Sequence, residues 1–507
     1  MVMASSGNVL PQPTGSALLQ PVSQRLQIPL EQVNFVACQL FALVAAFWFR
    51  IYLSPSNAHP TVRHALATII GTCFSVFCFG WYSMHLFILV LLCYCIMIVT
   101  SAKNVHRYSL IMAMGYLTIC QINRVYIFNY GILTNDFSGP LMIITQKITT
   151  LAFQLHDGMG RSFEDLTNDQ RQFLIKKKPS FLEYLSYHLN FMSVLAGPCS
   201  NFVDYTAFIE GHHIQSKLLN LKTNGYTKLQ NPSPNEAVMY KLCIVAASLV
   251  LYLAFSKSFP ILYVLDETFI AETSFLTRLC YLYCVIQARK PRYYFAWILA
   301  DAVNNAAGYG FNGVDEKGKY RWDLISTLDI WNIEISTSFK MYIDNWNIQT
   351  AVWLKRICYD RAPKYHTGLT FLLSALWHGV YPGYYFTFIT GIPVMLAARV
   401  IRKNFRHFFT SSAPLKFLYD LLTWIVTQLA VCYTVAPFVL LAIEPTIQFY
   451  KSVYFCFHIL CFLAIILLPK KPRESNRIVL SKDTTPYPKK HLDEKLYQGE
   501  QEKLHTS

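Results

Sequence analysis

Charged side chains are scarce in this sequence. Asp, Glu, Lys and Arg make up 14% of the 507 residues, whereas soluble domains carry about 25%. Hydrophobic residues make up 53%, aromatic residues 15%, and the mean hydropathy is +0.30. This composition argues against a soluble protein and predicts an all-α membrane protein that crosses the bilayer several times. One helical bundle can then take up most of the chain, although the length alone would suit several soluble domains.

Sequence patterns for metal binding and secretion are also missing. The 14 cysteines include no C-x-x-C pair, and no histidines at paired spacing accompany them. They predict small buried hydrophobic residues and argue against a structural zinc site. The N-terminus lacks a basic stretch followed by a short apolar core, so no cleaved signal peptide is expected. No internal repeat at a fixed spacing is visible, which weakens the case for a transporter.

The charge that is present is mostly positive. Lys and Arg number 44 against 29 Asp and Glu, which gives a formal net charge of +15. Nucleic-acid binding is one interpretation, but cytosolic loops that face anionic lipid headgroups explain the excess better in a membrane protein. The stretch Arg399–Arg406 is expected to be a basic loop, and Lys470–Arg473 to begin a basic tail. Two long spans separate them, so both are predicted on the cytosolic side.

Apolar runs occur along most of the chain. A span needs roughly 20 apolar residues, and about 11 spans are predicted, with shorter tilted and re-entrant helices around a central tunnel. The predicted organisation is a polar segment at 1–31, a transmembrane domain at 32–469 and a disordered cytosolic tail at 470–507. The expected runs are Phe35–Leu53, Ala65–Tyr82, Leu86–Ser101, Tyr108–Phe128, Leu141–Leu155, Tyr184–Leu195, Ala237–Phe255, Phe259–Leu265, Phe275–Ala288, Tyr293–Ala307, Leu369–His378, Tyr384–Ala398, Phe417–Ile443 and Val453–Leu468.

The stretch from Asn345 to Phe386 combines an amide and an imidazole with apolar surroundings. Asn347 lies in D-N-W-N-I-Q-T, and His378 lies in L-L-S-A-L-W-H-G-V-Y-P-G. Ionisable groups at membrane depth are costly, so His378 is predicted to be functional; the alternative is a histidine that bonds a neighbouring carbonyl. A histidine can take a proton from an alcohol, and an asparagine amide can donate to an oxyanion. The pair therefore suits acyl transfer from a thioester to a hydroxyl, if two elements bring it together.

A second polar group follows Y-Y-F-A-W, in the segment from Tyr293 to Gly313. It predicts either a tightly packed helix that ends at glycine or the polar lining of a substrate tunnel. The tunnel interpretation selects Tyr294, Trp297, Asn304 and Asn305, and, near the first stretch, Asn345, Trp377 and Tyr384.

Basic residues also lie between Asn347 and His378. Lys355 and Arg356, with Arg361, occupy the polar part of this interval. Guanidinium and ammonium groups bind phosphate through charge-assisted hydrogen bonds. Lys355 and Arg356 are therefore candidate residues for binding the phosphates of a nucleotide cofactor from the cytosolic side.

Several of these motifs together resemble one family. The motifs W-N-x-x-T, S-A-L-W-H-G-V-Y-P-G-Y-Y, Y-Y-F-A-W and N-N-A-A-G-Y-G-F-N-G resemble those of the membrane-bound O-acyltransferases. The stretches D-F-S-G-P-L-M-I-I-T-Q-K-I-T at Asp136–Thr149 and P-S-F-L-E-Y-L-S-Y-x-x-N-F-M-S-V-L-A-G-P at Pro179–Pro198 fit the lysophospholipid acyltransferase branch. The resemblance runs from about Gln32 to Pro469, which is most of the chain.

The resemblance implies an activity and a site. The expected enzyme lies in the endoplasmic reticulum membrane and transfers an unsaturated acyl chain, such as oleoyl, from acyl-CoA to a lysophospholipid. The expected acceptors are lysophosphatidylethanolamine and lysophosphatidylserine. The enzyme is expected to be surrounded by membrane lipids and to bind no cofactor permanently. The family's catalytic histidine matches His378 and its asparagine Asn347, with Asn345 as a rival. The alternatives are a channel or transporter with a polar-lined pore, or a relative that acylates a protein or sterol.

Overall fold

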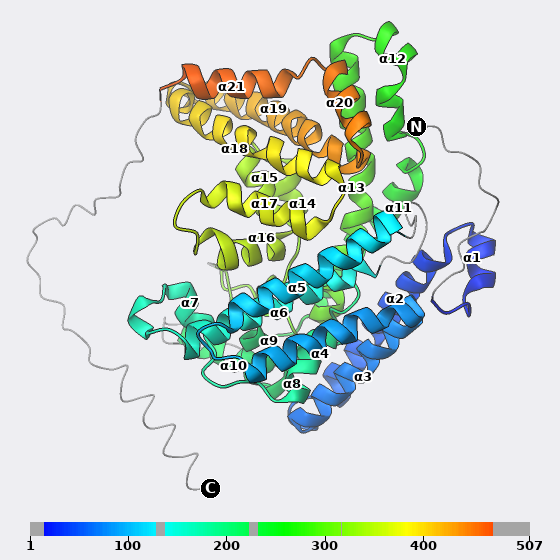
Figure 1. The fold of residues 1–507 in the computed structure, drawn as a ribbon, viewed down its shortest axis with the longest axis vertical. Helices are drawn as coiled ribbons and strands as arrows, with labels where there is room; N and C mark the ends of the chain where they lie inside the picture. The colour runs from blue at the N-terminus through cyan, green and yellow to red at the C-terminus, as the bar shows by residue number, and fades with distance from the viewer. Residues whose placement is uncertain (1–14, 128–136, 223–231, 316, 470–507) are drawn as a thin grey trace, which may run out of the picture. The chain divides into compact units, whose positions relative to one another are not determined.

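The structure is helical throughout the residues that it describes. A computed structural model describes residues 15–127, 137–222, 232–315 and 317–469 (Figure 1). In these ranges the only strand-like pairing is one antiparallel bridge between Val314 and Tyr320. The prediction of an all-α fold is confirmed. Residues 1–14 of the predicted N-terminal segment and the predicted tail at 470–507 lie outside the described residues.

The first part of the chain forms long helices followed by short ones. Their bounds are α1 (Gln20–Leu26), α2 (Leu30–Tyr52), α3 (Pro60–Phe79), η1 (Gly80–Ser83), α4 (Met84–Val99), α5 (Val105–Ile122), η2 (Asn123–Ile127), α6 (Ser138–Met159), η3 (Phe163–Asp165), α7 (Asn168–Phe173), α8 (Phe181–Leu189), α9 (Phe202–Glu210) and α10 (His213–Lys222).

The second part places short helices between long ones. Their bounds are α11 (Asn235–Phe255), η4 (Ile261–Leu265), α12 (Glu267–Glu272), α13 (Phe275–Ala306), α14 (Ile330–Glu334), α15 (Phe339–Asn345), α16 (Ile348–Leu354), η5 (Lys355–Tyr359), α17 (His366–His378), α18 (Pro382–Phe409), α19 (Ala413–Leu440), α20 (Ile443–Ser452) and α21 (Cys456–Leu467).

Within the described ranges, five helical runs are long and apolar enough to cross a membrane. They are Leu30–Tyr52, Pro60–Val99, Asn235–Phe255, Pro382–Phe409 and Ala413–Leu440. The bent pair α20 and α21, which turns by 72°, adds a sixth if it acts as one span. The chain is therefore a multi-pass membrane protein. The total of about 11 spans stays a prediction, because several expected runs form helices too short for one straight crossing.

Helix α13 corrects the expectation of two separate spans at Phe275–Ala288 and Tyr293–Ala307. The helix continues through the charged interval between them, with Pro291 inside it. Two of the three charged side chains of this interval have partners in the bundle, and the third, Arg292, is exposed. Lys290 lies 3.3 Å from the Glu334 carboxylate, and Arg289 donates to the Phe259 carbonyl at 3.3 Å. Because these partners satisfy those two charges, the chain does not need to leave the bundle there.

Two further boundaries differ from the sequence prediction. The helix expected at Tyr184–Leu195 ends at Leu189, because Asn190 leaves the helical conformation and its amide donates to the Ser186 and Tyr187 carbonyls at 3.0 Å. The basic stretch Arg399–Arg406 is not a loop but the last turns of α18, which ends at Phe409. Lys and Arg near the C-terminal end of a helix interact favourably with the helix dipole, so this basic stretch can remain helical.

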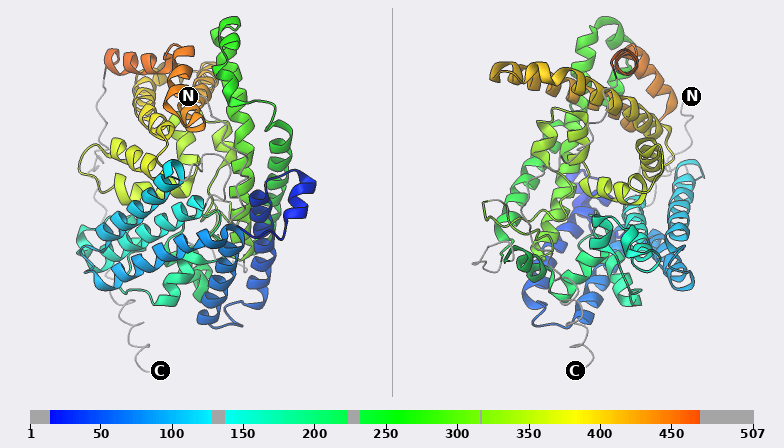
Figure 2. Two further views of the ribbon diagram at one scale, coloured as in Figure 1. Left: turned by 45° about the vertical axis from the view of Figure 1, so that its right-hand side comes forward. Right: turned by 90° about the vertical axis from the view of Figure 1, so that its left-hand side faces the viewer.

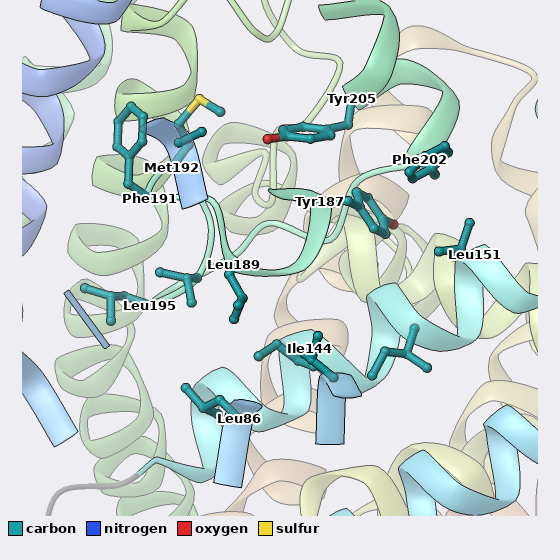
Figure 3. Packing of buried hydrophobic residues seen from close by; sticks show 14 of the residues in the cluster. Leu86, Ile144, Leu151, Tyr187, Leu189, Phe191, Met192, Leu195, Phe202 and Tyr205 are labelled. Carbon is teal, nitrogen blue, oxygen red and sulfur yellow. The ribbon is translucent and has the colours of Figure 1, made fainter. Parts of the chain in front are cut away.

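Helix α6 lies at the centre of the largest hydrophobic cluster. Its apolar residues Leu141, Ile144, Ile148, Leu151 and Leu155 recur every three or four positions and are all buried. This spacing places them on one face of the helix. Figure 3 shows Ile144 and Leu151 in a cluster with residues of α4, α8 and the segment after α8. The run expected at Leu141–Leu155 therefore belongs to a buried helix.

Helices far apart in the sequence pack side by side (Figure 2). Helix α2 packs against α13, and α5 contacts α17. Helix α18 contacts α15, α17, α19 and α21. The short helices α15, α16 and α17, which carry Asn345, Asn347 and His378, thus lie among longer helices from both parts of the chain.

Candidate active site

His378 is the last residue of α17, and the next residue explains why the helix ends there. Gly379 has φ of +140°, a backbone conformation that residues other than glycine rarely adopt. Pro382 then begins α18, and proline suits the first turn of a helix because that turn leaves its N–H unpaired. The sequence H-G-V-Y-P therefore places the imidazole at the junction of two helices.

Aromatic rings surround the imidazole of His378. Its ring centre lies 4.7 Å from Trp377, 5.2 Å from Phe388, 5.1 Å from Phe438 and 5.8 Å from Tyr384. The side chain is half-buried. No hydrogen bond joins the imidazole to any residue within the described ranges, which does not fit the alternative of a histidine bonded to a carbonyl. Its ring nitrogens are therefore available to a substrate hydroxyl.

The two candidate asparagines differ in how their amides are used. Nδ2 of Asn345 donates to the Met341 carbonyl at 2.8 Å within α15. Asn347 precedes α16 with φ of +50° and makes no capping hydrogen bond with its side chain. Asparagine tolerates this left-handed conformation better than most residues. Across the described residues, no hydrogen bond to the Asn347 amide is found, so this amide is the better placed of the two to bind a substrate.

The structure brings the segments of Asn347 and His378 together through their tryptophans. Trp353 of α16 lies 5.7 Å from Trp377 of α17 between ring centres. Asn347 and His378 do not bond each other in the described structure, so a reacting group would have to connect them. Of the predicted tunnel residues, Trp377 and Tyr384 lie beside His378.

Tyr294 and Trp297 lie in a different group, around Trp346. The Trp346 ring is 5.6 Å from Trp297 and 6.1 Å from Tyr294 between centres. The Tyr294 hydroxyl donates to Glu334 at 2.6 Å. The sequence analysis did not select Trp346 or Glu334, although Trp346 stands beside Asn347 in W-N-x-x-T. Tyr294, Trp297 and Trp346 therefore form an aromatic cluster next to the Asn347 segment.

The side-chain amides of Asn304 and Asn305 donate hydrogen bonds to backbone carbonyls. Both are fully buried. Nδ2 of Asn304 donates to the Met192 and Ala300 carbonyls at 3.0 and 2.8 Å, and Nδ2 of Asn305 donates to the Trp322 carbonyl at 3.1 Å. These contacts match the interpretation of a tightly packed helix that ends at glycine. A role of these two amides in lining a tunnel stays a prediction.

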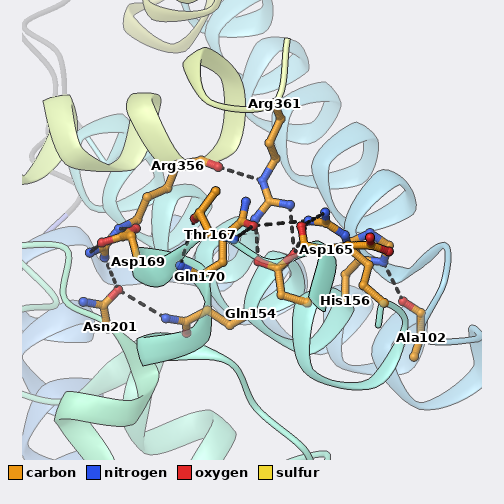
Figure 4. Close-up of polar contacts among 12 residues, drawn as sticks. Ala102, Gln154, His156, Asp165, Thr167, Asp169, Gln170, Asn201, Arg356 and Arg361 are labelled. Atoms are coloured by element: carbon orange, nitrogen blue, oxygen red, sulfur yellow. Dashed lines mark hydrogen bonds and ion pairs between the residues drawn. The ribbon is translucent and has the colours of Figure 1, made fainter. Parts of the chain in front are cut away.

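Arg356 and Arg361, which follow α16, are bound by carboxylates (Figure 4). Arg356 binds both oxygens of Asp169 at 2.8 Å and Oδ1 of Asn201 at 2.7 Å. Arg361 binds both oxygens of Asp157 at 2.9 and 2.5 Å. Lys355 is exposed. Because its guanidinium already binds a carboxylate, Arg356 would have to give up an ion pair to bind phosphate.

Another basic site is a pocket of about 370 Å³ between α15 and α18. Its charged residues are Lys340, Asp344, Arg399 and Arg402, and its apolar part includes Met395. Lys340 pairs with Asp344. Arg399 and Arg402 have no carboxylate partner among the described residues, so the pocket keeps an excess of positive charge. In the sequence, these arginines indicate only which side of the membrane the basic stretch faces. The pocket that they line together with Asn345 is visible only in the tertiary structure.

Comparisons with known proteins agree with the motifs. A model of the membrane-bound O-acyltransferase family matches residues 122–436. Membrane-bound glycerophospholipid O-acyltransferase 1 of Mus musculus is 66% identical over 92% of this chain and 95% of its own length. Membrane-bound glycerophospholipid O-acyltransferase 2 of Homo sapiens is 54% identical over 92% of this chain and 90% of its own. Lysophospholipid acyltransferase 6 of Drosophila melanogaster is 39% identical over 92% of this chain and 65% of its own.

Proposed function

Because the chain belongs to the membrane-bound O-acyltransferase family, we propose that it transfers a fatty acyl group from acyl-CoA to a lysophospholipid. The names of its relatives support a glycerophospholipid as the product. Within this proposal the acceptor is lysophosphatidylethanolamine or lysophosphatidylserine, the acyl chain is unsaturated, such as oleoyl, and the membrane is that of the endoplasmic reticulum. The reaction serves the remodelling of phospholipid acyl chains.

One observation carries the mechanism: the half-buried imidazole of His378 has aromatic neighbours and no hydrogen-bond partner in the described structure. In the proposed reaction the imidazole takes the proton of the acceptor hydroxyl, usually at the sn-2 position, as its oxygen attacks the thioester carbon. The carbon–sulfur bond then breaks, an ester forms, and the CoA thiolate leaves and takes up the proton. No acyl-enzyme intermediate is formed.

Asn347 is the proposed oxyanion donor. Its amide is free of other hydrogen bonds among the described residues, whereas the Asn345 amide bonds the backbone of its own helix. An amide N–H aimed at the developing oxyanion stabilises the transition state more than the ground state. This difference favours Asn347 over Asn345 as the catalytic amide.

The pocket between α15 and α18 supports the choice of donor. Acyl-CoA carries phosphates that bind arginine well, and Arg399 and Arg402 offer guanidinium groups that have no carboxylate partner in the described part of the chain. These arginines form part of a basic helix end, and the excess of positive charge there favours the cytosolic side. Acyl-CoA would therefore reach the site from the cytosol.

The test measures CoA release by purified protein with oleoyl-CoA and a panel of lysophospholipids that differ in headgroup. We expect release that depends on the headgroup, a fall of about 10²- to 10⁴-fold in His378→Ala, and a fall of about 10²- to 10³-fold in Asn347→Ala. Asn345→Ala is the matched control for Asn347→Ala and should lose clearly less CoA release. Each variant is compared with wild type for its thermal unfolding midpoint and elution volume.

Three outcomes would contradict the proposal. Equal release by wild type and folded His378→Ala would remove the general-base role. A larger loss in Asn345→Ala than in Asn347→Ala would reverse the assignment of the amide. No release by wild type with any lysophospholipid would favour a protein or sterol acceptor, or a channel or transporter.

A further inference from the structure

Helix α6 contacts the segment that follows Asn347 through three polar side-chain pairs. Each pair joins a residue of α6 to a residue 204 positions later in the chain. We name the three pairs the α6 contact series: Gln146–Thr350 at 2.8 Å, Thr149–Trp353 at 2.8 Å, and Asp157–Arg361 at 2.9 and 2.5 Å.

The constant separation defines how the two segments lie. Because both partners advance by the same number of residues from one pair to the next, α6 and the segment from α16 to Arg361 run in the same direction and in register. Gln146 and Thr149 are three positions apart, so they share one face of the helix. Both are buried, with 1% and 0% of their surface exposed. Buried polar pairs whose groups are satisfied favour one arrangement over its alternatives.

The central pair has a defined hydrogen-bond direction. Oγ1 of Thr149 donates to the Thr145 carbonyl at 2.8 Å. Because its only proton is used in that bond, the hydroxyl presents a lone pair to Nε1 of Trp353, which can only donate. This bond therefore fixes the position of the Trp353 indole relative to α6.

The same helix also holds the residue next to His378. Nε1 of Trp377 donates to the Met142 carbonyl at 3.1 Å. Met142 lies one turn before Gln146, at the end of the α6 contact series. The Trp353 and Trp377 rings then contact each other, with 5.7 Å between their centres. Helix α6 therefore binds both the segment that begins at Asn347 and the segment that ends at His378.

The opposite face of α6 keeps the helix itself in place. Ile144 and Ile148 each lie two residues from Gln146, and Leu151 lies two residues after Thr149, which places these three residues about half a turn away from the two polar residues. Both isoleucines are buried in the main hydrophobic cluster with Leu151. A helix that is held by a packed core on one face can fix side chains on the other face.

We infer that α6 is a positioning element that aligns the segments of Asn347 and His378 for acyl transfer. The inference rests on the proposed function, which makes these two residues catalytic. Among the described residues, the hydrogen bonds that join α6 to these two segments go to Thr350, Trp353, Arg361 and Trp377 and not to Asn347 or His378, so the α6 residues are positioning residues. The motif at Asp136–Thr149 thereby gains a physical role, since Met142, Gln146 and Thr149 belong to its described part.

The experiment removes the central pair, and Thr149→Val does so with little change in side-chain volume. Thr149→Val, Trp353→Phe and the double variant are purified, and kcat and KM are measured for oleoyl-CoA and the lysophospholipid. We expect kcat to fall about tenfold or more in each single variant, because misplacing reacting groups on the order of 1 Å can cost about a hundredfold. Both KM values should stay close to wild type. The double variant should match the more affected single variant, because both changes remove one shared bond.

Two further variants separate positioning from general stability. Thr145→Val makes the same chemical change one turn earlier, where the hydroxyl is buried without a partner in the described structure, and should keep wild-type kcat. Thr149→Ser keeps the acceptor and should restore most of the rate. If Thr149→Val does not fold, Thr350→Val removes the neighbouring pair and takes its place. Unchanged kcat in folded Thr149→Val, equal losses in Thr145→Val, or independent losses in the double variant would overturn the inference.

A second readout needs no substrate. The rate at which diethyl pyrocarbonate modifies His378, followed by peptide mass spectrometry, depends on how the imidazole is held. We expect Thr149→Val to change this rate more than twofold and Thr145→Val to leave it unchanged; equal rates in all three proteins would overturn the inference. CoA release by wild type tests the proposed function. The rate of His378 modification tests the positioning role of α6 and does not require that function. A failure of the proposed function can therefore be distinguished from a failure of the further inference.

Discussion

Gly379 shows how much of the candidate site depends on a single residue. Its backbone has φ of +140°, and an added Cβ would lie 3.3 Å from Cε2 of Tyr384 and 3.5 Å from the Gln121 side chain. Tyr384 itself contacts the His378 ring. A side chain at this position would therefore strain the backbone and press on a neighbour of the proposed general base.

Gly379→Ala should lower both stability and activity. Backbone strain of this kind costs about 1–3 kcal/mol, so the thermal unfolding midpoint should fall by several degrees, and kcat should fall with it. Gly368→Ala is the matched control, because Gly368 lies within α17, the helix that Gly379 ends, and an added Cβ would meet nothing within 4 Å. That variant should be as stable as wild type or slightly more so. Equal midpoints for the two variants would show that the Gly379 conformation can relax.

At the scale of the helix, α18 connects the two ends of the proposed reaction path. Its first turns carry Tyr384 and Phe388, which contact His378, and its later turns carry Arg399 and Arg402 at the pocket beside Asn345. No charged residue occurs from Pro382 to Ala398. The first charged residues thus stand where the helix leaves its apolar stretch, which suits a site that receives an anionic substrate from the aqueous side.

Arg402→Gln should weaken the use of acyl-CoA. Losing one charge-assisted contact to phosphate should raise the KM for acyl-CoA about tenfold, with kcat and the KM for the lysophospholipid near wild type. Lys403→Gln removes one positive charge from the next position of α18, outside the residues that line the pocket, and should have little effect. Steady-state kinetics at two salt concentrations would check this. Similar shifts in the two variants would point to general surface charge instead of a specific contact.

At the scale of the whole molecule, the bent pair α20 and α21 decides the topology. The turn between α18 and α19 follows a basic helix end, and positive charge favours the cytosolic side for it and for the predicted tail. Both can lie there only if the chain crosses the membrane again after α19. The 72° bend between α20 and α21 leaves two possibilities, one broken span or a re-entrant pair.

Two epitope tags would distinguish these possibilities. One tag is inserted after Ser411 in the α18–α19 turn, and the other is placed at the C-terminus. In sealed microsomes we expect protease added outside to remove both tags, because both should face the cytosol. Permeabilised microsomes and a lumenal marker provide the control. Protection of only one tag would show that α20 and α21 together do not cross the membrane, and would contradict the prediction that the basic stretch and the tail share one side.

The sequence alone determined the class of the molecule, and it predicts the reactive residues. Scarce charge and long apolar runs predict a helical membrane protein because burying ionised groups in lipid is costly. The histidine and asparagine motifs stand out because few side chains can exchange a proton or donate to an oxyanion. These are properties of local composition and chemistry, and a linear sequence displays them directly.

Only the tertiary structure decided how these residues are held and which polar groups are free. Arg356 and Arg402 look alike in the sequence, but Arg356 binds Asp169 and Arg402 lines a pocket. Likewise, the sequence predicts two separate runs at Phe275–Ala288 and Tyr293–Ala307, yet one helix continues through both, and Lys290 between them pairs with Glu334 on a distant element. Pairs such as Thr149 and Trp353 depend on contacts between residues 204 positions apart. Packing of the whole bundle sets such contacts, so no local pattern can reveal them.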